Sequence, residues 1–287
     1  MTLASLRDVR FTYAFSDRPA LDGLSLEWER GRVHGVVGLN SSGKSTLCAL
    51  IRGIIPHFHS GELSGRVEIL GRELEDWDPA ELSTAIGCVF DNPFTQISGI
   101  RDTVFEEISI GLENLGVPRD DIIDRVTRVV RRLGIAHLVD KNPNGLSGGQ
   151  RQKVAFASII AMDAEVMVID EPTSQLDPES SEEVFEIIRG LKDAGKSIVL
   201  VEHKIDLLAA YADTITVLHG GAVVMTGPTR EVLGSPELAA FCIRPPEVVE
   251  LAVRLRDDGR DLGLMPMTRG EAAQAVAARM EEARRAY

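Results

Sequence analysis

The stretch that decides the fold is GLNSSGKST, residues 38–46. It matches G-x-x-x-x-G-K-[ST] and lies between an apolar run at 33–37, which predicts a buried strand, and helical spacing at 44–53. Glycines let such a loop wrap a phosphate with backbone N–H groups, and the helix N-terminus adds the positive end of its dipole. If Ser41 needs a positive φ, serine there costs on the order of 1 kcal/mol relative to glycine. We therefore predict a phosphate-binding loop made of Gly38, Asn40, Ser41, Ser42, Gly43, Lys44, Ser45 and Thr46.

Two acids at the end of a second apolar run complement this loop. In EVMVIDE, residues 165–171, a predicted buried strand ends in Asp170 and Glu171. Lys44 would contact the β- and γ-phosphates, and Ser45 would offer a hydroxyl to Mg²⁺, which Asp170 can also hold. Glu171 can polarise an attacking water molecule. The strand ending is a weak signal alone, but the phosphate loop makes it a strong one.

The motif LSGGQ, residues 146–150, places a serine and two glycines where a helical pattern begins. Alone, it could be a serine N-cap followed by flexible glycines, although a helix N-terminus also binds anions. Together with the other motifs, it makes residues 3–233 resemble the ATP-binding-cassette ATPases. In that family two cassettes face each other, so the resemblance implies that each ATP also contacts the partner's Ser147, Gly148, Gly149 and Gln150.

Further residues follow in the order of that family. SQLD at 174–177 resembles the D-loop, which implies that Asp177 lies at the nucleotide. His203, after the apolar run SIVLVE, resembles the switch histidine, and Tyr13 resembles the aromatic residue that stacks on adenine. A strand-end histidine or a strand tyrosine can instead be purely structural. The resemblance implies ATP and Mg²⁺ as cofactors, with Glu171 and His203 as catalytic residues.

Within the family, the chain resembles the ATPase subunits of energy-coupling-factor importers. The similar stretches are CVFDNPFTQ at 88–96, TVFEE at 103–107, GLENLG at 111–116 and the tail from RPP at 244–246. Those importers carry vitamins or transition-metal ions. The resemblance implies a peripheral ATPase at the cytoplasmic face of the cell membrane. Its expected partners are a second cassette subunit, identical or similar, a transmembrane coupling subunit and a small substrate-binding membrane subunit.

Asp91 departs from the pattern of these importers, which have glutamine at this position. Aspartate is shorter and charged. It could still ligate Mg²⁺, but it places an anion near the developing charge on the γ-phosphate. Asp91 is therefore either a working catalytic and metal-binding residue or the mark of a slower site in a heterodimer. We favour the first alternative because Glu171 and His203 are both present.

Strand and helix patterns alternate after residue 165, which predicts a mostly parallel sheet with helices on both faces. We expect an α/β fold: a P-loop NTPase core, an N-terminal antiparallel β subdomain and an α-helical signature subdomain at about 92–162. Residues 54–64 are expected to be a loop, and Gly220-Gly221 a hairpin turn. The nucleotide-binding domain would span 1–234, and a helical extension 235–287.

Composition narrows the function classes. The formal net charge is −13, which fits poorly with nucleic-acid binding, and we expect no nucleic-acid partner. No apolar run approaches the roughly 18 residues of a membrane span. Cys48, Cys88 and Cys242 are widely spaced and are expected to be reduced thiols. His57 and His59 lack a third metal ligand nearby in sequence, so a metal site there is disfavoured.

Other cassette ATPases are alternatives. DNA-repair and chromosome-organising members insert a long coiled coil or extra domains between the phosphate loop and the signature. Here residues 47–145 fill that interval and contain no heptad run. The subunit of an exporter or a cytosolic assembly ATPase is the more plausible alternative.

Overall fold

Strand β3 (Val33–Val37) lies inside a six-stranded sheet of order β10-β9-β3-β8-β7-β6. The computed structural model describes residues 1–90 and 92–285. Strands β6, β7, β8 and β9 run parallel to β3, and β10 closes the sheet with the predicted antiparallel hairpin. Their bounds are β6 Ile86–Val89, β7 Val166–Asp170, β8 Ser197–Val201, β9 Thr214–His219 and β10 Ala222–Pro228. The predicted α/β class with a mostly parallel sheet is confirmed.

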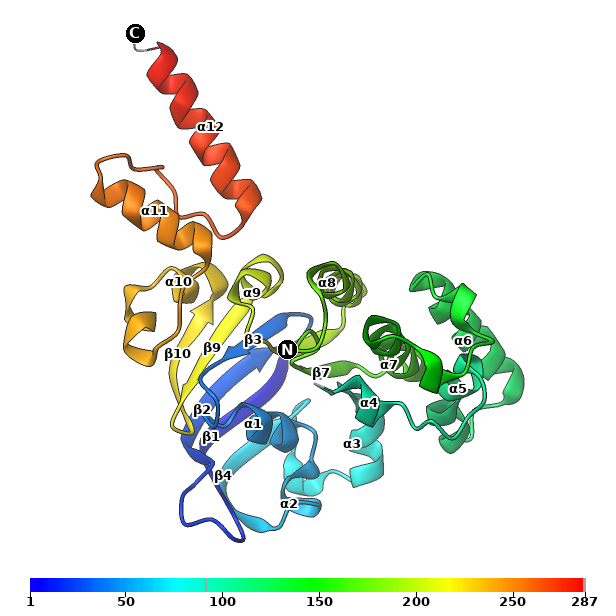
Figure 1. Cartoon of the computed structure of the whole chain (residues 1–287). Helices are drawn as coiled ribbons and strands as arrows, with labels where there is room; N and C mark the ends of the chain where they lie inside the picture. The colour runs from blue at the N-terminus through cyan, green and yellow to red at the C-terminus, as the bar shows by residue number, and fades with distance from the viewer. Residues whose placement is uncertain (91, 286–287) are drawn as a thin grey trace.

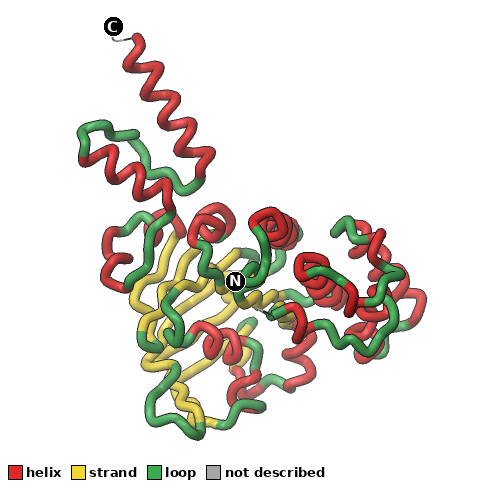
Figure 2. The backbone as a smooth tube through the Cα atoms, in the orientation of Figure 1, coloured by secondary structure: helices red, strands yellow, loops and turns green. Residues whose placement is uncertain are grey.

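Both faces of this sheet are covered, which explains why its central strands are apolar without alternation (Figures 1 and 2). Helix α1 (Lys44–Ile51) and the antiparallel sheet cover one face, and their apolar side chains pack with Val168 and Val199. Helices α8 (Pro178–Asp193) and α9 (Ile205–Tyr211) cover the other. The strand ends that carry the predicted motifs are therefore held between two packed layers.

The antiparallel sheet has the order β2-β1-β4-β5. Its strands are β1 (Thr2–Tyr13), β2 (Leu21–Glu29), β4 (Gly61–Ile69) and β5 (Arg72–Glu73). The expected loop at 54–64 is wrong at both ends: Ile54–His57 forms the short helix α2, and β4 already begins at Gly61. The cause is strand β1, whose last residue, Tyr13, pairs with Gly61 and draws this polar segment into the sheet.

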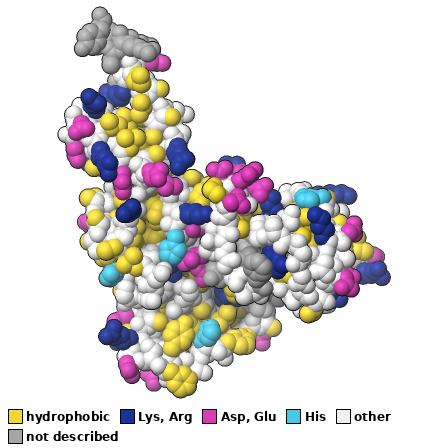
Figure 3. Space-filling model, in the orientation of Figure 1, with side chains coloured by type: hydrophobic (Ala, Val, Ile, Leu, Met, Phe, Trp, Pro, Cys, Tyr) yellow, Lys and Arg dark blue, Asp and Glu magenta, His cyan; other side chains and the backbone are white. Residues whose placement is uncertain are grey.

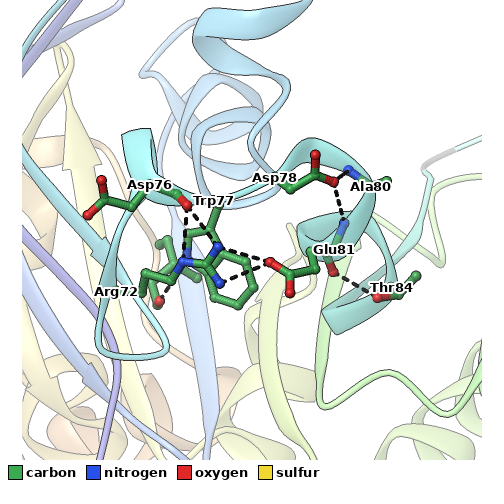
Figure 4. Close-up of polar contacts among 8 residues, drawn as sticks. Arg72, Asp76, Trp77, Asp78, Ala80, Glu81 and Thr84 are labelled. Carbon is green, nitrogen blue, oxygen red and sulfur yellow. Dashed lines mark hydrogen bonds and ion pairs between the residues drawn. The ribbon is translucent and has the colours of Figure 1, made fainter.

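Helix α3 (Pro79–Ala85) was not predicted, although its start carries a sequence signal. The carboxylate of Asp78 accepts hydrogen bonds from the backbone N–H groups of Ala80 and Glu81, which caps the helix (Figure 4). The guanidinium of Arg72 lies 4.3 Å from the centre of the Trp77 ring and donates to Glu81 at 2.9 Å. These contacts fix the helix beside the edge strand β6.

A separate apolar core holds the signature subdomain together. Helix α5 (Val104–Asn114) and helix α6 (Arg119–Arg132) are separated at Gly116 and Pro118, and both pack on helix α7 (Gly148–Met162). The short helix α4 (Pro93–Gln96) joins this unit to β6. Short 3₁₀ turns occupy Leu74–Asp76, Ala136–Leu138, Pro143–Gly145 and Pro236–Phe241.

The C-terminal part contains α10 (Thr229–Leu233), α11 (Glu247–Asp257) and α12 (Arg269–Arg285). Helix α12 projects away from the two sheets and packs on α11 around a small cluster that includes Ala252 and Ala275 (Figure 1). Hydrophobic side chains gather on the visible face of this part (Figure 3). Among the described helices, none is both long and apolar enough to cross a bilayer.

His34 is a buried titratable residue in the central strand. Its Nε2 lies 2.7 Å from the Glu29 carbonyl oxygen, which only accepts, so Nε2 carries the proton and Nδ1 accepts from the Thr214 hydroxyl, also at 2.7 Å. The ring stacks on Trp28 at 5.4 Å. Burial lowers the pKa of His34 below 6.5 because the charged ring is poorly solvated there.

This lowered pKa predicts a loss of stability in acid. Well above pH 6.5, His34 is neutral in the folded and in the unfolded protein. As the pH falls below 6.5, the imidazole binds a proton in the unfolded chain but stays neutral in the folded chain. The free energy of unfolding should then fall by up to about 1.4 kcal/mol per pH unit from this residue. Urea unfolding of the wild type and of His34→Gln between pH 7.5 and 5.5 measures it. The exposed His57→Gln is the control, and equal slopes for wild type and His34→Gln would refute the assignment.

Candidate active site

The predicted phosphate loop connects β3 to α1 and uses unusual backbone angles. Ser41 has φ 64°, so the condition stated for this serine is met, and Gly43 has φ 104°. A Cβ atom on Gly43 would lie 2.7 Å from the Ala20 carbonyl oxygen, and one on Gly38 would lie 2.4 Å from that of Leu218. The two glycines are therefore required by backbone conformation and by close backbone approach.

Lys44 is held inside this loop. Its side-chain nitrogen donates to the carbonyl oxygens of Gly38 at 2.9 Å and Leu39 at 3.1 Å, and the residue is 6% exposed. Burial lowers the pKa of Lys44, and the nearby Glu171 and Asp170 oppose that shift. The cation thus lies within electrostatic reach of both predicted acids.

The hydroxyl oxygen of Ser42 is buried and has no hydrogen-bond partner among the described residues. A buried hydroxyl that makes no hydrogen bond is unfavourable, so a phosphate oxygen at this loop would give it a partner. The buried hydroxyl of Ser42, the enclosed ammonium group of Lys44 and the glycines that leave no room for a Cβ atom all fit a bound polyphosphate.

The second acid meets the predicted histidine. Glu171 Oε1 lies 2.8 Å from His203 Nε2, although the two residues follow different strands, β7 and β8. Glu171 adopts φ 44°, an uncommon conformation for a residue with a side chain, and its N–H donates to the Val201 carbonyl oxygen. Both side chains remain partly exposed, at 26% and 47%, so they can reach a ligand.

Tyr13, the last residue of β1, contacts the first turn of α1. Its hydroxyl oxygen is 3.2 Å from Thr46 Oγ1, next to the phosphate loop. Its ring also packs edge-on against Phe11 at 4.8 Å and His59 at 6.0 Å. The half-buried ring is thus a packed strand aromatic that also borders the phosphate loop.

The signature motif is placed elsewhere. Ser147 caps α7 in a reciprocal pair of hydrogen bonds with Gln150, and a Cβ atom on Gly149 would lie 2.8 Å from Ser180 Oγ. Asp177 caps α8 beside it, and hydrogen bonds from Ser180 hold the pKa of Asp177 below its usual range. Helix α7 packs on α5 and α6, whereas α1 packs on α2 and β7 (Figure 1). Among the described residues, the hydrogen bonds of the signature motif and those of Lys44 in the phosphate loop therefore involve different partners.

Sequence reasoning missed the residues behind the Glu171–His203 pair. Glu202 is only 3% exposed and forms hydrogen bonds to the loops on both sides, together with Thr173 and Lys204. The available signal was a carboxylate that continues the apolar strand Ser197–Val201. Asp91 lies outside the described residues. Within the described part of the chain, no group of three or more histidine, cysteine or acidic side chains is arranged to hold a metal ion.

Comparisons with known proteins show the family to which the chain belongs. A profile of the ABC transporter family matches residues 21–174. The energy-coupling factor transporter ATP-binding protein EcfA1 of Bacillus subtilis is 39% identical over 261 residues, which are 90% of each chain. The structure of cbiO1 from Clostridium perfringens, part of the ABC transporter complex cbiONQ, has a TM-score of 0.75 and 30% identity, covering 90% of this chain and 97% of its own. The dimeric structure of an ATP-binding cassette bound to ADP and phosphate has a TM-score of 0.68 and 25% identity, covering 79% of this chain and 99% of its own.

The close backbone contact at Gly43 gives a prediction for the loop. Alanine at Gly43 must adopt the strained φ and also push against the Ala20 carbonyl, whereas alanine at Gly71 meets the strain alone, because nothing lies within 4 Å of its Cβ. Gly43→Ala should therefore lower the free energy of unfolding by about 1–3 kcal/mol more than Gly71→Ala. Urea unfolding of both variants measures the difference, and equal losses would show that the close approach is unimportant.

Proposed function

This chain belongs to the ABC transporter family and hydrolyses ATP, and on that premise we propose that it is the ATPase subunit of an energy-coupling-factor importer. The observation that carries the proposal is the similarity to EcfA1 over 90% of both chains. The likeness to cbiO1 from the cbiONQ complex points the same way. The cargo would be a vitamin or a transition-metal ion, read by a different subunit.

ATP would lie along the phosphate loop. Tyr13 would stack on adenine beside α1, while the loop from Gly38 to Thr46 would surround the phosphates. Lys44 would exchange its carbonyl partners for the β- and γ-phosphates, which are stronger acceptors for an ammonium group. The hydroxyl of Ser42 would gain its missing partner.

The side chains expected near the γ-phosphate would suit Mg²⁺. Ser45 at the start of α1 and Asp170 at the end of β7 offer oxygen ligands, the kind that Mg²⁺ prefers, and Asp91 is a further candidate. Mg²⁺ would supply positive charge to the phosphate oxygens. Lys44, within electrostatic reach of Asp170, would add its own.

Glu171 and His203 would carry out the hydrolytic step. Glu171 would accept a proton from the water that attacks the γ-phosphate, and the positive φ of Glu171 holds its carboxylate at the strand end. His203 would orient this carboxylate through the 2.8 Å contact and hold the γ-phosphate in position.

A second cassette would complete each site. As in the cassette family that the chain belongs to, Ser147, Gly148, Gly149 and Gln150 would serve the partner's ATP, with Asp177 at the same interface. ATP binding would close the dimer and hydrolysis would reopen it. The C-terminal part exposes Leu251, Leu264 and Met280, which would provide a further contact with the partner.

The membrane coupling subunit would dock in a groove beside α4. This groove, of about 620 Å³, lies between the phosphate-loop helix, α3 and α7, and Arg52 lies over the Phe90 ring at 4.9 Å within it. Phe58 at its rim is 75% exposed. An apolar segment of a membrane protein would cover these aromatic side chains, and closure of the dimer would move it. The protein would thus act peripherally, at the cytoplasmic face of the cell membrane.

Glu171→Gln tests the hydrolytic role. The amide keeps the size of the side chain but cannot take up the proton, so turnover should fall at least about 100-fold. ATP binding should persist, and the closed dimer should accumulate. Steady-state ATPase assays and gel filtration with ATP measure both effects, with the exposed Glu231→Gln as the control. Unchanged turnover in Glu171→Gln would exclude this role.

Asp91→Gln tests the departure from the importer pattern. If Asp91 is a working residue, the purified wild-type chain should hydrolyse ATP in a Mg²⁺-dependent manner, without the replacement of Asp91 by glutamine. Steady-state assays of the two proteins decide the matter. If the wild type does not hydrolyse ATP and Asp91→Gln restores hydrolysis, Asp91 instead marks a slower site.

The importer proposal is tested at the membrane. The tagged chain, extracted in detergent from its native cells, should bring an integral membrane subunit with it. Phe58→Glu should lose that subunit, whereas Phe15→Glu, on a fully exposed residue outside the groove, should keep it. If no integral membrane protein accompanies the wild type, the proposal is wrong and the cytosolic alternative is favoured.

A further inference from the structure

The Glu171–His203 contact joins two loops that could otherwise move independently. Glu171 follows β7 and His203 follows β8, and their carboxylate and imidazole meet at 2.8 Å. The side chains of both are partly exposed, so packing alone does not fix them. Some other contact must set the distance between the loops.

Glu202 makes that contact. Its Oε1 accepts hydrogen bonds from the backbone N–H groups of His203 at 2.8 Å and Lys204 at 3.0 Å. Its Oε2 accepts from the hydroxyl of Thr173 at 2.7 Å, and Thr173 is fully buried two residues after Glu171. A single carboxylate therefore holds the His203 backbone on one side and the Glu171 loop on the other.

Lys204 provides a second link on the opposite side of His203. Its side-chain nitrogen donates to the Thr173 carbonyl oxygen at 3.2 Å and to Ser181 Oγ at 2.7 Å. His203 thus lies between two residues that both reach the segment after Glu171. The ammonium group also places a positive charge in the network that contains the buried carboxylate.

We propose that Glu202 is a positioning residue for ATP hydrolysis, which sets the geometry of Glu171 and His203 through Thr173 and the backbone of residues 203 and 204. A carboxylate suits this task because it only accepts hydrogen bonds and three donors face it. Bonds to a charged acceptor are stronger than neutral ones, so they hold the loops firmly. This inference rests on the proposed roles of Glu171 and His203.

The test compares Glu202→Ala with Glu202→Gln. Glutamine can keep its oxygen on the two backbone N–H groups and turn its amide toward the Thr173 hydroxyl, whereas alanine loses every bond. Misplacement of a catalytic group by about 1 Å costs up to about 100-fold in rate, so we expect kcat to fall roughly 10- to 100-fold in Glu202→Ala. The KM for ATP should stay within about twofold, and Glu202→Gln should recover most of the rate.

Two readouts separate positioning from a general structural role. In a His203→Ala background, single-turnover hydrolysis should show a smaller further loss from Glu202→Ala than in the wild type, because one of the two residues that Glu202 positions is gone. The ¹⁵N signal of the His203 imidazole should change in Glu202→Ala, as we also expect in Glu171→Gln, because the Nε2 contact is lost. Thr173→Val, which removes one donor and keeps the shape, should shift both readouts in the same direction and replaces Glu202→Ala if that variant does not fold.

The outcomes distinguish the two proposals. If Glu171→Gln and His203→Ala both retain full turnover, the assigned catalytic pair is wrong. If those variants are impaired but Glu202→Ala and Thr173→Val hydrolyse ATP at the wild-type rate, the positioning role alone is overturned. Equal losses from Glu202→Ala with and without His203 would likewise overturn it.

Discussion

The parallel pairing of β3, β8 and β7 is the constraint on which the rest of the structure depends. In this pairing Val36, Val201 and Asp170 lie side by side on three neighbouring strands. The three strands therefore end at the same side of the sheet. The phosphate loop, the segment with His203 and the segment with Glu171 start from that side. Burial on both faces anchors these strands, because moving one of them out of place would take apolar side chains away from the two cores.

The sequence predicts the parts of the site that are local. The phosphate loop needs glycines at fixed spacing, and the strand before it and the helix after it each show their own hydrophobic pattern. The order strand, loop, helix over residues 33–53 could therefore be predicted. The contact between Glu171 and His203 could not be predicted from the residues alone, since it depends on which strands are neighbours. Glu202 was missed for the same reason: its partner Thr173 is distant in sequence.

Elements at the edges of the fold were predicted less well. The segment 54–64 has the composition of a loop, yet β1 is long enough to pair with its end and turn it into the start of β4. Helix α3 is short, and its Asp78 cap is a weak sequence signal compared with the longer periodic patterns. In both cases a tertiary partner decided the structure, and the local sequence carried only part of the signal.

We propose that ATP is hydrolysed at sites shared between two chains, since the signature motif and Lys44 of the phosphate loop have different hydrogen-bond partners within one chain. The most direct test mixes two variants, Lys44→Ala and Ser147→Arg, each of which spoils both sites of its own dimer. A mixed dimer regains one site in which both residues are intact. The mixture should hydrolyse ATP well above the rate of either variant alone. A mixture as inactive as its components, beside a wild type that turns over, would contradict it.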